Sequence, residues 1–408
     1  MAALAALSSP IPASASTSAP ATRTSGTGAG VAAFGTVGGP TTDRIRSQQW
    51  QLRALHATEA WRQADGSGVT VAVIDSGVDG SHPDLAGQVL PGKDFVRSGD
   101  GQRDEVGHGT TVAGLIAGRG DDSTGVLGLA PGAKILPVRV LDSRNRYDDA
   151  RVVANALRWA VDHGAEVVNL SLGGSVASPE LADAIDYAFE KDVVVVACTG
   201  NESPPDVAEV WYPAREPGVL AVTGLARDGD TLWPGSLSGP ATVLAAPGTD
   251  LVGARPDGYW TVEGTSFAAP LVTAAAALVR SKWPAMSAAT VVNRLIRSAG
   301  DLGDPGRDTA YGFGLVDPLR ALTDDIPDVA VNPLDTTPPP PGKARFARAN
   351  ASPEAAVSQA ASSSAAPPPP PTGTLHRPAL ASLPAGIAVV LVLVGGAAAT
   401  LRRFASSA

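Results

Sequence analysis

The chain has 408 residues, of which 44% are hydrophobic and 17% are charged, and its formal net charge at pH 7 is -9. This apolar content is enough for a large core, while 45 glycines and 35 prolines indicate low-complexity segments beside the globular part. No run of Lys or Arg is long enough to predict a nucleic-acid partner. The single cysteine, Cys198, excludes an intrachain disulfide but fits either the cytosol or export.

Residues 1–43 are rich in Ala, Ser, Thr, Gly and Pro, and this composition predicts a disordered N-terminal segment. It could include a degenerate signal peptide, because residues 1–7 are apolar and residues 13–15 read Ala-Ser-Ala, like a cleavage site. A basic region is missing and the apolar stretch is short for a signal peptide. A misassigned start codon is the alternative.

Residues 44–325 are predicted to form one α/β domain. Short β-branched runs, typical of strands buried on both faces, alternate with helical patterns. This alternation predicts a parallel central sheet with helices on both faces. The strands are expected at 69–74, 133–141, 167–172, 193–197 and 219–223, and helices at 149–162 and 179–191.

Two further segments complete the chain. Residues 326–378 contain two proline runs and predict an extended linker that reaches roughly 150 Å at most, although a proline-rich recognition motif is the alternative. Residues 379–401 carry no charge, and a helix of about 22 residues matches a hydrocarbon core of about 30 Å. We therefore expect a transmembrane helix there, rather than a buried core helix. Arg402 and Arg403 then predict a cytoplasmic tail over 402–408 and a catalytic domain outside the cell.

Three short motifs carry residue types that suit nucleophilic catalysis. Asp75 ends a predicted strand, His108 lies between two glycines, and Ser266 begins an almost wholly apolar helical pattern. Ligand sites gather at such strand ends, and the first N–H groups of a helix favour developing negative charge. Taken singly, the three residues could equally be a turn former, a structural histidine and a helix N-cap.

Together, in the order Asp, His, Ser, these motifs resemble the subtilisin-like serine proteases of peptidase family S8, over residues 44–325. The resemblance implies that Ser266 attacks a peptide carbonyl, that His108 accepts and returns the proton, and that Asp75 orients the imidazole. It also implies that Asn201, in a Thr-Gly-Asn motif, stabilises the oxyanion. A turn asparagine is the alternative for Asn201.

The same resemblance predicts where a peptide substrate binds and where some relatives bind calcium. It places Ser171, Leu172 and Gly173 where an extended polypeptide substrate adds as a strand, while Tyr147 either lines a pocket or lies on the surface. Asp84 and Asp122 fall where some relatives bind calcium. Two carboxylates do not supply six to eight oxygens, so neither a metal nor another cofactor is predicted, and calcium stays an open alternative.

Within the family, the chain is most similar to the mycosins, membrane-anchored proteases of type VII secretion systems. The likeness rests on residues 49–61, which have the look of an entry segment, the proline-rich linker, the C-terminal apolar segment and the short region before the domain. It implies an endopeptidase that cuts extracellular or envelope proteins at the cell membrane. The alternative is a structural subunit that stabilises a secretion complex, with proteolysis secondary.

Overall fold

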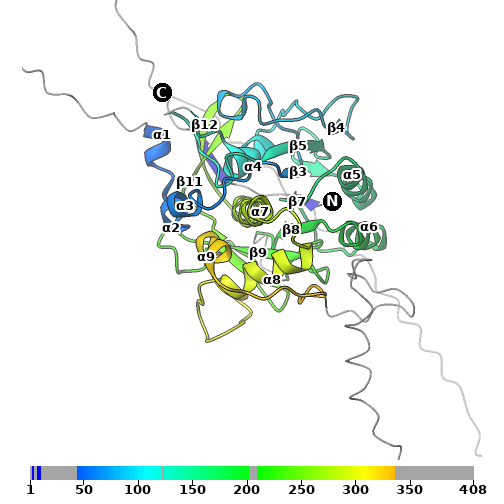
Figure 1. The fold of residues 1–408 in the computed structure, drawn as a ribbon. Coiled ribbons are helices and arrows are strands. Elements are labelled where there is room, and N and C mark those ends of the chain that lie inside the picture. Colours follow the sequence, from blue (N-terminus) through cyan, green and yellow to red (C-terminus); the bar gives the residue numbers. More distant parts are fainter. Residues whose placement is uncertain (1, 4–6, 11–43, 122–123, 202–208, 336–408) are drawn as a thin grey trace, which may run out of the picture. The chain divides into compact units, whose positions relative to one another are not determined.

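A parallel seven-stranded sheet runs through the centre of the described chain (Figure 1). The computed structural model describes residues 2–3, 7–10, 44–121, 124–201 and 209–335. The strands lie in the order β10-β9-β8-β7-β3-β5-β4, and each neighbouring pair is parallel, which confirms the predicted sheet. Their bounds are Thr70–Asp75 (β3), Lys93–Asp94 (β4), Lys134–Arg139 (β5), Val167–Leu170 (β7), Val194–Cys198 (β8), Leu220–Leu225 (β9) and Leu244–Pro247 (β10).

Helices cover both faces of this sheet. The chain passes from β3 to β5 through α4 (His108–Ala117), and then returns in the opposite direction through α5 (Ala150–Asp162) and α6 (Pro179–Glu190). Because such crossovers are right-handed, α4 lies on one face and α5 and α6 on the other (Figure 1). Helix α7 (Thr265–Lys282) packs beside α4 and is buried except for its last two residues.

The two helices predicted at 149–162 and 179–191 begin next to polar capping residues. Asp149 accepts a hydrogen bond from the Arg151 N–H at the start of α5, and Ser178 accepts one from the Leu181 N–H at the start of α6. Every residue of β8 and β9 is buried, which explains why these segments read as continuous apolar runs rather than as alternating patterns.

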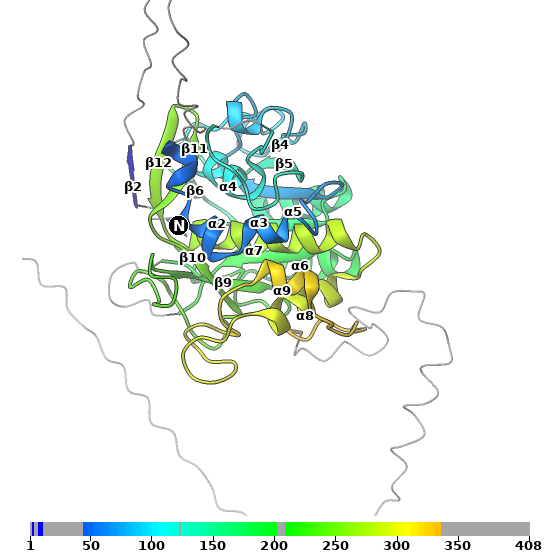
Figure 2. The ribbon, with the colours of Figure 1, turned by 60° about the vertical axis from the view of Figure 1, so that its left-hand side comes forward.

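The segment before the sheet is folded onto the domain. It forms three short helices, α1 (Arg44–Ser47), α2 (Trp50–Ala54) and α3 (Ala57–Ala60), which lie close to α7 and the β11–β12 hairpin in Figure 2. The indole of Trp50 is buried and donates to the Thr249 carbonyl at 3.0 Å. The remaining elements are η1 (Pro83–Leu85), β6 (Arg146–Tyr147), β11 (Leu251–Arg255), β12 (Gly258–Glu263), α8 (Ala288–Ser298) and α9 (Pro318–Thr323).

Two short strands lie within residues 1–43. Strand β1 (Ala2–Ala3) pairs antiparallel with β6, and β2 (Leu7–Pro10) pairs antiparallel with β12, beside which Figure 2 shows it. The other residues of this predicted disordered segment lie outside the described residues. The edges of β6 and β12 therefore both accept an extended strand.

The start of the predicted linker lies against the domain. Arg294 donates to the Ile326 carbonyl at 3.1 Å, and Asn332 donates to the Gly218 carbonyl at 2.9 Å. Residues 336–378, the predicted transmembrane helix at 379–401 and the tail at 402–408 lie outside the described residues. Among the helices that are described, none combines the length and the apolar character needed to cross a bilayer.

Candidate active site

The three predicted catalytic residues come from three different elements that meet at one place. Asp75 is the last residue of β3, His108 is the first of α4, and Ser266 is the second of α7. All three side chains are at most 1% exposed. The His108 ring lies 5.2 Å from the ring of Phe267, the residue after Ser266, so the packing of α4 on α7 brings the histidine to the serine.

Asp75 and His108 are directly hydrogen-bonded. Nδ1 of His108 lies 2.7 Å from Oδ1 of Asp75, and the same oxygen accepts the Ser76 N–H at 2.7 Å. The close approach of α4 to β3 requires a glycine at 109, because a Cβ there would lie 2.1 Å from the Gly77 carbonyl oxygen. Nε2 of His108 has no hydrogen-bond partner among the described residues, so its orientation is set entirely through Nδ1.

The Ser266 hydroxyl contacts the segment that follows β7 and the thiol at the end of β8. Its Oγ lies 3.3 Å from the Ser171 carbonyl oxygen and 3.9 Å from Sγ of Cys198, and in the described chain no hydrogen bond joins it to the histidine. Burial raises the pKa of the Cys198 thiol to about 11, so this neighbour is uncharged near neutral pH.

A buried ladder of hydrogen bonds fixes the backbone of Ser266. Thr273 of α7 donates to Asn169 of β7 at 2.8 Å, and Asn169 donates to the Ser171 hydroxyl at 2.9 Å. That hydroxyl in turn donates to the Ser266 carbonyl at 2.6 Å. Sequence reasoning did not single out Asn169, although an amide inside the apolar run of β7 was the available signal.

Asp104 is a second residue that sequence reasoning missed. It is 8% exposed and lies in the loop that leads into α4. The Thr110 N–H and hydroxyl donate to Oδ2 at 2.9 and 2.7 Å, and Oδ1 accepts from the Ser76 hydroxyl at 2.9 Å and the Gly107 N–H at 2.7 Å. The carboxylate thereby joins the end of β3 to the start of α4, which positions His108 against Asp75.

Asn201 lies at the N-terminus of α7, where it contacts the first residue of the helix. Its Oδ1 accepts from both the N–H and the hydroxyl of Thr265, at 3.0 and 2.9 Å. With the oxygen held in this way, the amide nitrogen is the end of the side chain that can donate to an oxyanion. The first N–H groups of α7, including that of Ser266, have no acceptor within the helix and lie at the same corner.

The predicted peptide-binding edge follows β7. Ser171 and Leu172 are completely buried, and Gly174, the next residue after Gly173, exchanges backbone hydrogen bonds with Tyr212 at 2.9 and 2.8 Å. Tyr147 lies in β6 and is half-buried against the core, and burial raises its pKa to about 12. The β6 edge that carries Tyr147 holds β1, so it binds extended backbone.

The Asp84 carboxylate is hydrogen-bonded within the protein through both of its oxygens. Asp84 is 2% exposed, its Oδ2 accepts the Val126 N–H at 2.6 Å, and its Oδ1 accepts the Tyr259 hydroxyl at 3.1 Å. The guanidinium of Arg46 donates to the Thr124 carbonyl of the same loop at 2.6 Å. Asp122 lies outside the described residues, which contain no group of three His, Cys, Asp or Glu side chains placed to hold a metal.

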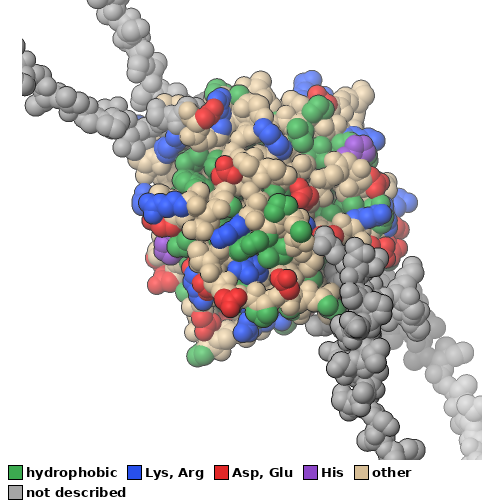
Figure 3. Space-filling view, viewed as in Figure 1, with side chains coloured by type: hydrophobic (Ala, Val, Ile, Leu, Met, Phe, Trp, Pro, Cys, Tyr) green, Lys and Arg blue, Asp and Glu red, His purple; other side chains and the backbone are tan. Residues whose placement is uncertain are grey.

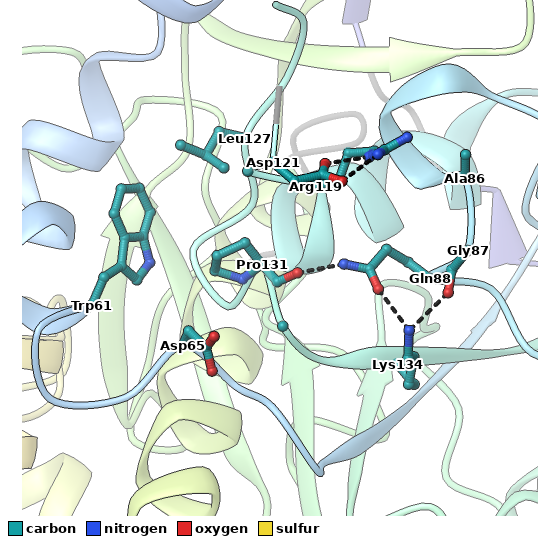
Figure 4. A pocket seen from close by; sticks show the side chains of 12 residues that line it. Trp61, Asp65, Ala86, Gly87, Gln88, Arg119, Asp121, Leu127, Pro131 and Lys134 are labelled. Carbon is teal, nitrogen blue, oxygen red and sulfur yellow. Dashed lines mark hydrogen bonds and ion pairs between the residues drawn. The ribbon is translucent and has the colours of Figure 1, made fainter. Parts of the chain in front are cut away.

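A cavity of about 640 Å³ lies away from the catalytic residues, and none of these lines it (Figure 4). Lys134, the first residue of β5, donates there to the Gly87 carbonyl at 2.7 Å and to Oε1 of Gln88 at 3.0 Å, and Gln88 donates to the Pro131 carbonyl. Lys134 and Gln88 are therefore hydrogen-bonded to each other and to backbone carbonyls at this cavity.

Charged side chains are mixed over the face shown in Figure 3. Lys and Arg lie among Asp and Glu across the described part of this face, without the broad basic area that phosphate backbones require. The expectation that the chain has no nucleic-acid partner stays a prediction.

Comparisons with known proteins agree with this geometry. A profile of the subtilase family, Peptidase_S8, matches residues 66–314. Thermitase from Thermoactinomyces vulgaris is 37% identical over 286 residues, which cover 69% of this chain and 99% of thermitase. Fervidolysin from Fervidobacterium pennivorans is 35% identical over 70% of this chain, which spans about half of that relative's length (45%).

Solved structures show the same likeness. The structure of fervidolysin, described as a keratinolytic enzyme related to subtilisin, has a TM-score of 0.65 at 34% identity over 70% of this chain and 47% of that one. The structure of the MycP3 protease from the type VII (ESX-3) secretion system has a TM-score of 0.61 at 34% identity, and the match covers 70% of this chain and 90% of that one.

Proposed function

This chain belongs to the subtilase family and its folded domain is that of a subtilisin-like serine protease, and we propose that Ser266, His108 and Asp75 form its catalytic triad. The observation that carries the proposal is the 2.7 Å contact between His108 Nδ1 and Asp75, which leaves Nε2 as the ring nitrogen without a hydrogen-bond partner among the described residues. Asp75 thereby holds the tautomer in which Nε2 accepts a proton.

In the proposed reaction, Ser266 turns from its resting position, transfers its proton to Nε2 of His108 and attacks the peptide carbonyl. The imidazolium, stabilised by the Asp75 carboxylate, then protonates the leaving amine, and an acyl-enzyme remains on Ser266. Water repeats the sequence in the deacylation step. The Asn201 amide and the Ser266 N–H donate to the oxyanion, and each such donor contributes about 3 kcal/mol of transition-state stabilisation.

Substrate binding uses main-chain hydrogen bonds along the segment Ser171–Gly173 and the edge of β6. These edges recognise extended polypeptide and not a particular side chain. Support comes from β1 and β2, which pair with β6 and β12 as a bound strand would. The proposed substrates are therefore unfolded or loop segments of proteins.

The triad is tested by Ser266→Ala in the full chain, with Ser98→Ala, an exposed serine in a surface loop, as the matched control. We expect Ser266→Ala to lose peptide hydrolysis by on the order of 10⁴-fold or more and to lose labelling by a serine-directed phosphonate. The Ser98→Ala control should keep both. Persistent labelling of the Ser266→Ala variant contradicts the proposed nucleophile.

We further propose that the protease is held at the cell membrane by residues 379–401, faces outward and acts with a type VII secretion complex. The proposal draws on the apolar C-terminal segment and on the structural likeness to the MycP3 protease. Truncation after Leu375 should release active enzyme from the membrane fraction into solution. Enzyme that stays in the membrane fraction after this truncation contradicts the anchor.

The secretion role is tested in a deletion strain of the source organism. If proteolysis is the contribution, secretion fails with Ser266→Ala as it does with the deletion. Secretion that is restored by Ser266→Ala shows instead that the chain acts as a structural subunit of the complex. Secretion that continues in the deletion strain contradicts both roles.

A further inference from the structure

Two backbone segments border the place where a substrate residue must lie beside Ser266. Segment 171–174 follows β7 and segment 199–201 follows β8, and because these strands are neighbours and parallel, the segments leave the sheet side by side. Ser171 contacts Ser266 through its hydroxyl, and Asn201 contacts the preceding Thr265. Both segments therefore belong to the site of the acyl group.

The proposed function fixes which substrate side chain enters the gap between them. The carbonyl under attack points its oxygen at Asn201, and the peptide on its acyl side runs along Ser171–Gly173. The side chain of the residue that carries this carbonyl then lies between the two segments. The space in this gap decides which residues can precede the scissile bond.

The gap is filled by Trp211. A Cβ built on Gly200 would lie 2.5 Å from Cδ2 of the indole, and one built on Gly173 would lie 3.2 Å from Trp211 Cβ, so the tryptophan touches both walls. Gly200 also has a φ of +104°, a conformation that disfavours any other residue. The Trp211 side chain is only 6% exposed.

Backbone hydrogen bonds fix the chain at Trp211 to both segments. The Trp211 N–H donates to the Thr199 carbonyl at 2.9 Å, and the next residue, Tyr212, exchanges two hydrogen bonds with Gly174. The tryptophan backbone is thus tied to both segments at once. Because this backbone is fixed and the side chain is only 6% exposed, the indole can leave the gap only by displacing its neighbours.

We propose that Trp211 is a specificity-determining residue that limits the residue before the scissile bond to Gly, Ala or Ser. The inference rests on the proposed serine-protease function. An indole occupies the volume that a large side chain would need, so only a hydrogen atom, a methyl group or a hydroxymethyl group fits between Gly173 and Gly200. Specificity in this protease then comes from steric exclusion of large side chains and not from favourable contacts with a preferred side chain.

The test compares matched quenched peptides that differ only in Ala or Phe before the cleaved bond. For the wild-type full chain, kcat/KM should favour Ala by on the order of 100-fold. In Trp211→Gly the preference should fall at least tenfold through a gain on the Phe peptide. Trp283→Phe, at the end of α7, should keep the wild-type ratio.

Equal cleavage of both peptides by the wild type overturns the inference, as does an unchanged ratio in a folded Trp211→Gly variant. If that variant does not fold, the wild-type protein still tests the inference. Peptidyl phosphonates with Ala next to phosphorus should label Ser266 on the order of 100-fold faster than those with Phe. Equal labelling rates would contradict the role of Trp211. A small phosphonate without a peptide part reports Ser266 reactivity separately. If it fails to react, the proposed function fails, and this inference with it.

Discussion

Asp75 and Asp84 are both buried carboxylates close to α4, yet their oxygens are used differently. Both oxygens of Asp84 accept hydrogen bonds, from the Val126 N–H and the Tyr259 hydroxyl. Asp75 receives His108 and Ser76 on one oxygen, and its second oxygen has no hydrogen-bond partner among the described residues. Such an unpaired buried oxygen is costly and has no structural use, whereas the Asp84 arrangement stabilises a loop.

Exchange of each carboxylate for its isosteric amide separates the two roles. In Asp75→Asn the amide presents a hydrogen atom to Nδ1 and favours the wrong imidazole tautomer, so kcat should fall by roughly 10⁴-fold. The urea midpoint should change little. Steady-state hydrolysis of a peptide and urea unfolding of the same preparation measure both effects, and a kcat loss below tenfold would remove Asp75 from the triad.

Asp84→Asn should show the opposite pattern. The neutral amide is a weaker acceptor for the Val126 N–H than the carboxylate, so we expect the free energy of unfolding to fall by about 1–2 kcal/mol. Its kcat should stay within about threefold of the wild type, because Asp84 contacts no catalytic residue. A large loss of kcat at unchanged stability would show that the loop acts on the catalytic site.

The Cys198 thiol, which lies 3.9 Å from the Ser266 hydroxyl, makes the stability of the catalytic site depend on pH. Burial raises the Cys198 pKa from its ordinary value of 9.0 to about 11, so between these two values the unfolded chain releases a proton that the folded chain retains. The contribution of the protonated thiol to the free energy of unfolding is therefore fully present below pH 9, and it is lost as the pH rises toward 11. From pH 8 to pH 10.5 the loss should be about 2 kcal/mol.

Urea unfolding of the wild type and of Cys198→Ala at both pH values isolates this contribution. The variant lacks the thiol, so it should lose about 2 kcal/mol less than the wild type over the same interval. Tyr147 titrates in both proteins, and because burial is the larger cause of its raised pKa and Cys198 the smaller one, most of its contribution cancels in the difference. An identical decline in the two proteins would show that the thiol ionises freely in the folded chain.

The smallest expected effect concerns metal ions at the Asp84 loop. Because Arg46 already donates to the Thr124 carbonyl, excess calcium and a chelator should give unfolding temperatures within about 1 °C of each other. Arg46→Gln should lower the stability by roughly 1 kcal/mol in both conditions. A calcium concentration-dependent rise in the unfolding temperature would show instead that the loop binds the ion.

The local pattern of the chain predicts much of the sheet and the catalytic motifs. Strands buried on both faces need continuous apolar runs, and the polar caps Asp149 and Ser178 mark where α5 and α6 begin. The resemblance supplied Asp75, His108, Ser266 and Asn201, because each lies in a short contiguous motif. The β11–β12 hairpin and α8 were not predicted, since their patterns are short or depend on packing partners far along the chain.

Other features depend on contacts between residues distant in sequence. Asp104, Asn169 and Cys198 acquire their roles only when β3, β7 and β8 are placed beside α4 and α7. Nothing around Trp211 in the sequence identifies it as a specificity residue, because Gly173 and Gly200 become its neighbours only in the folded sheet. The sequence by itself therefore determined the reaction class through motifs that are local. The tertiary structure alone decided what the serine hydroxyl contacts, which groups donate to the Asp84 carboxylate and how much room a substrate side chain finds, since each of these depends on distances between separate elements.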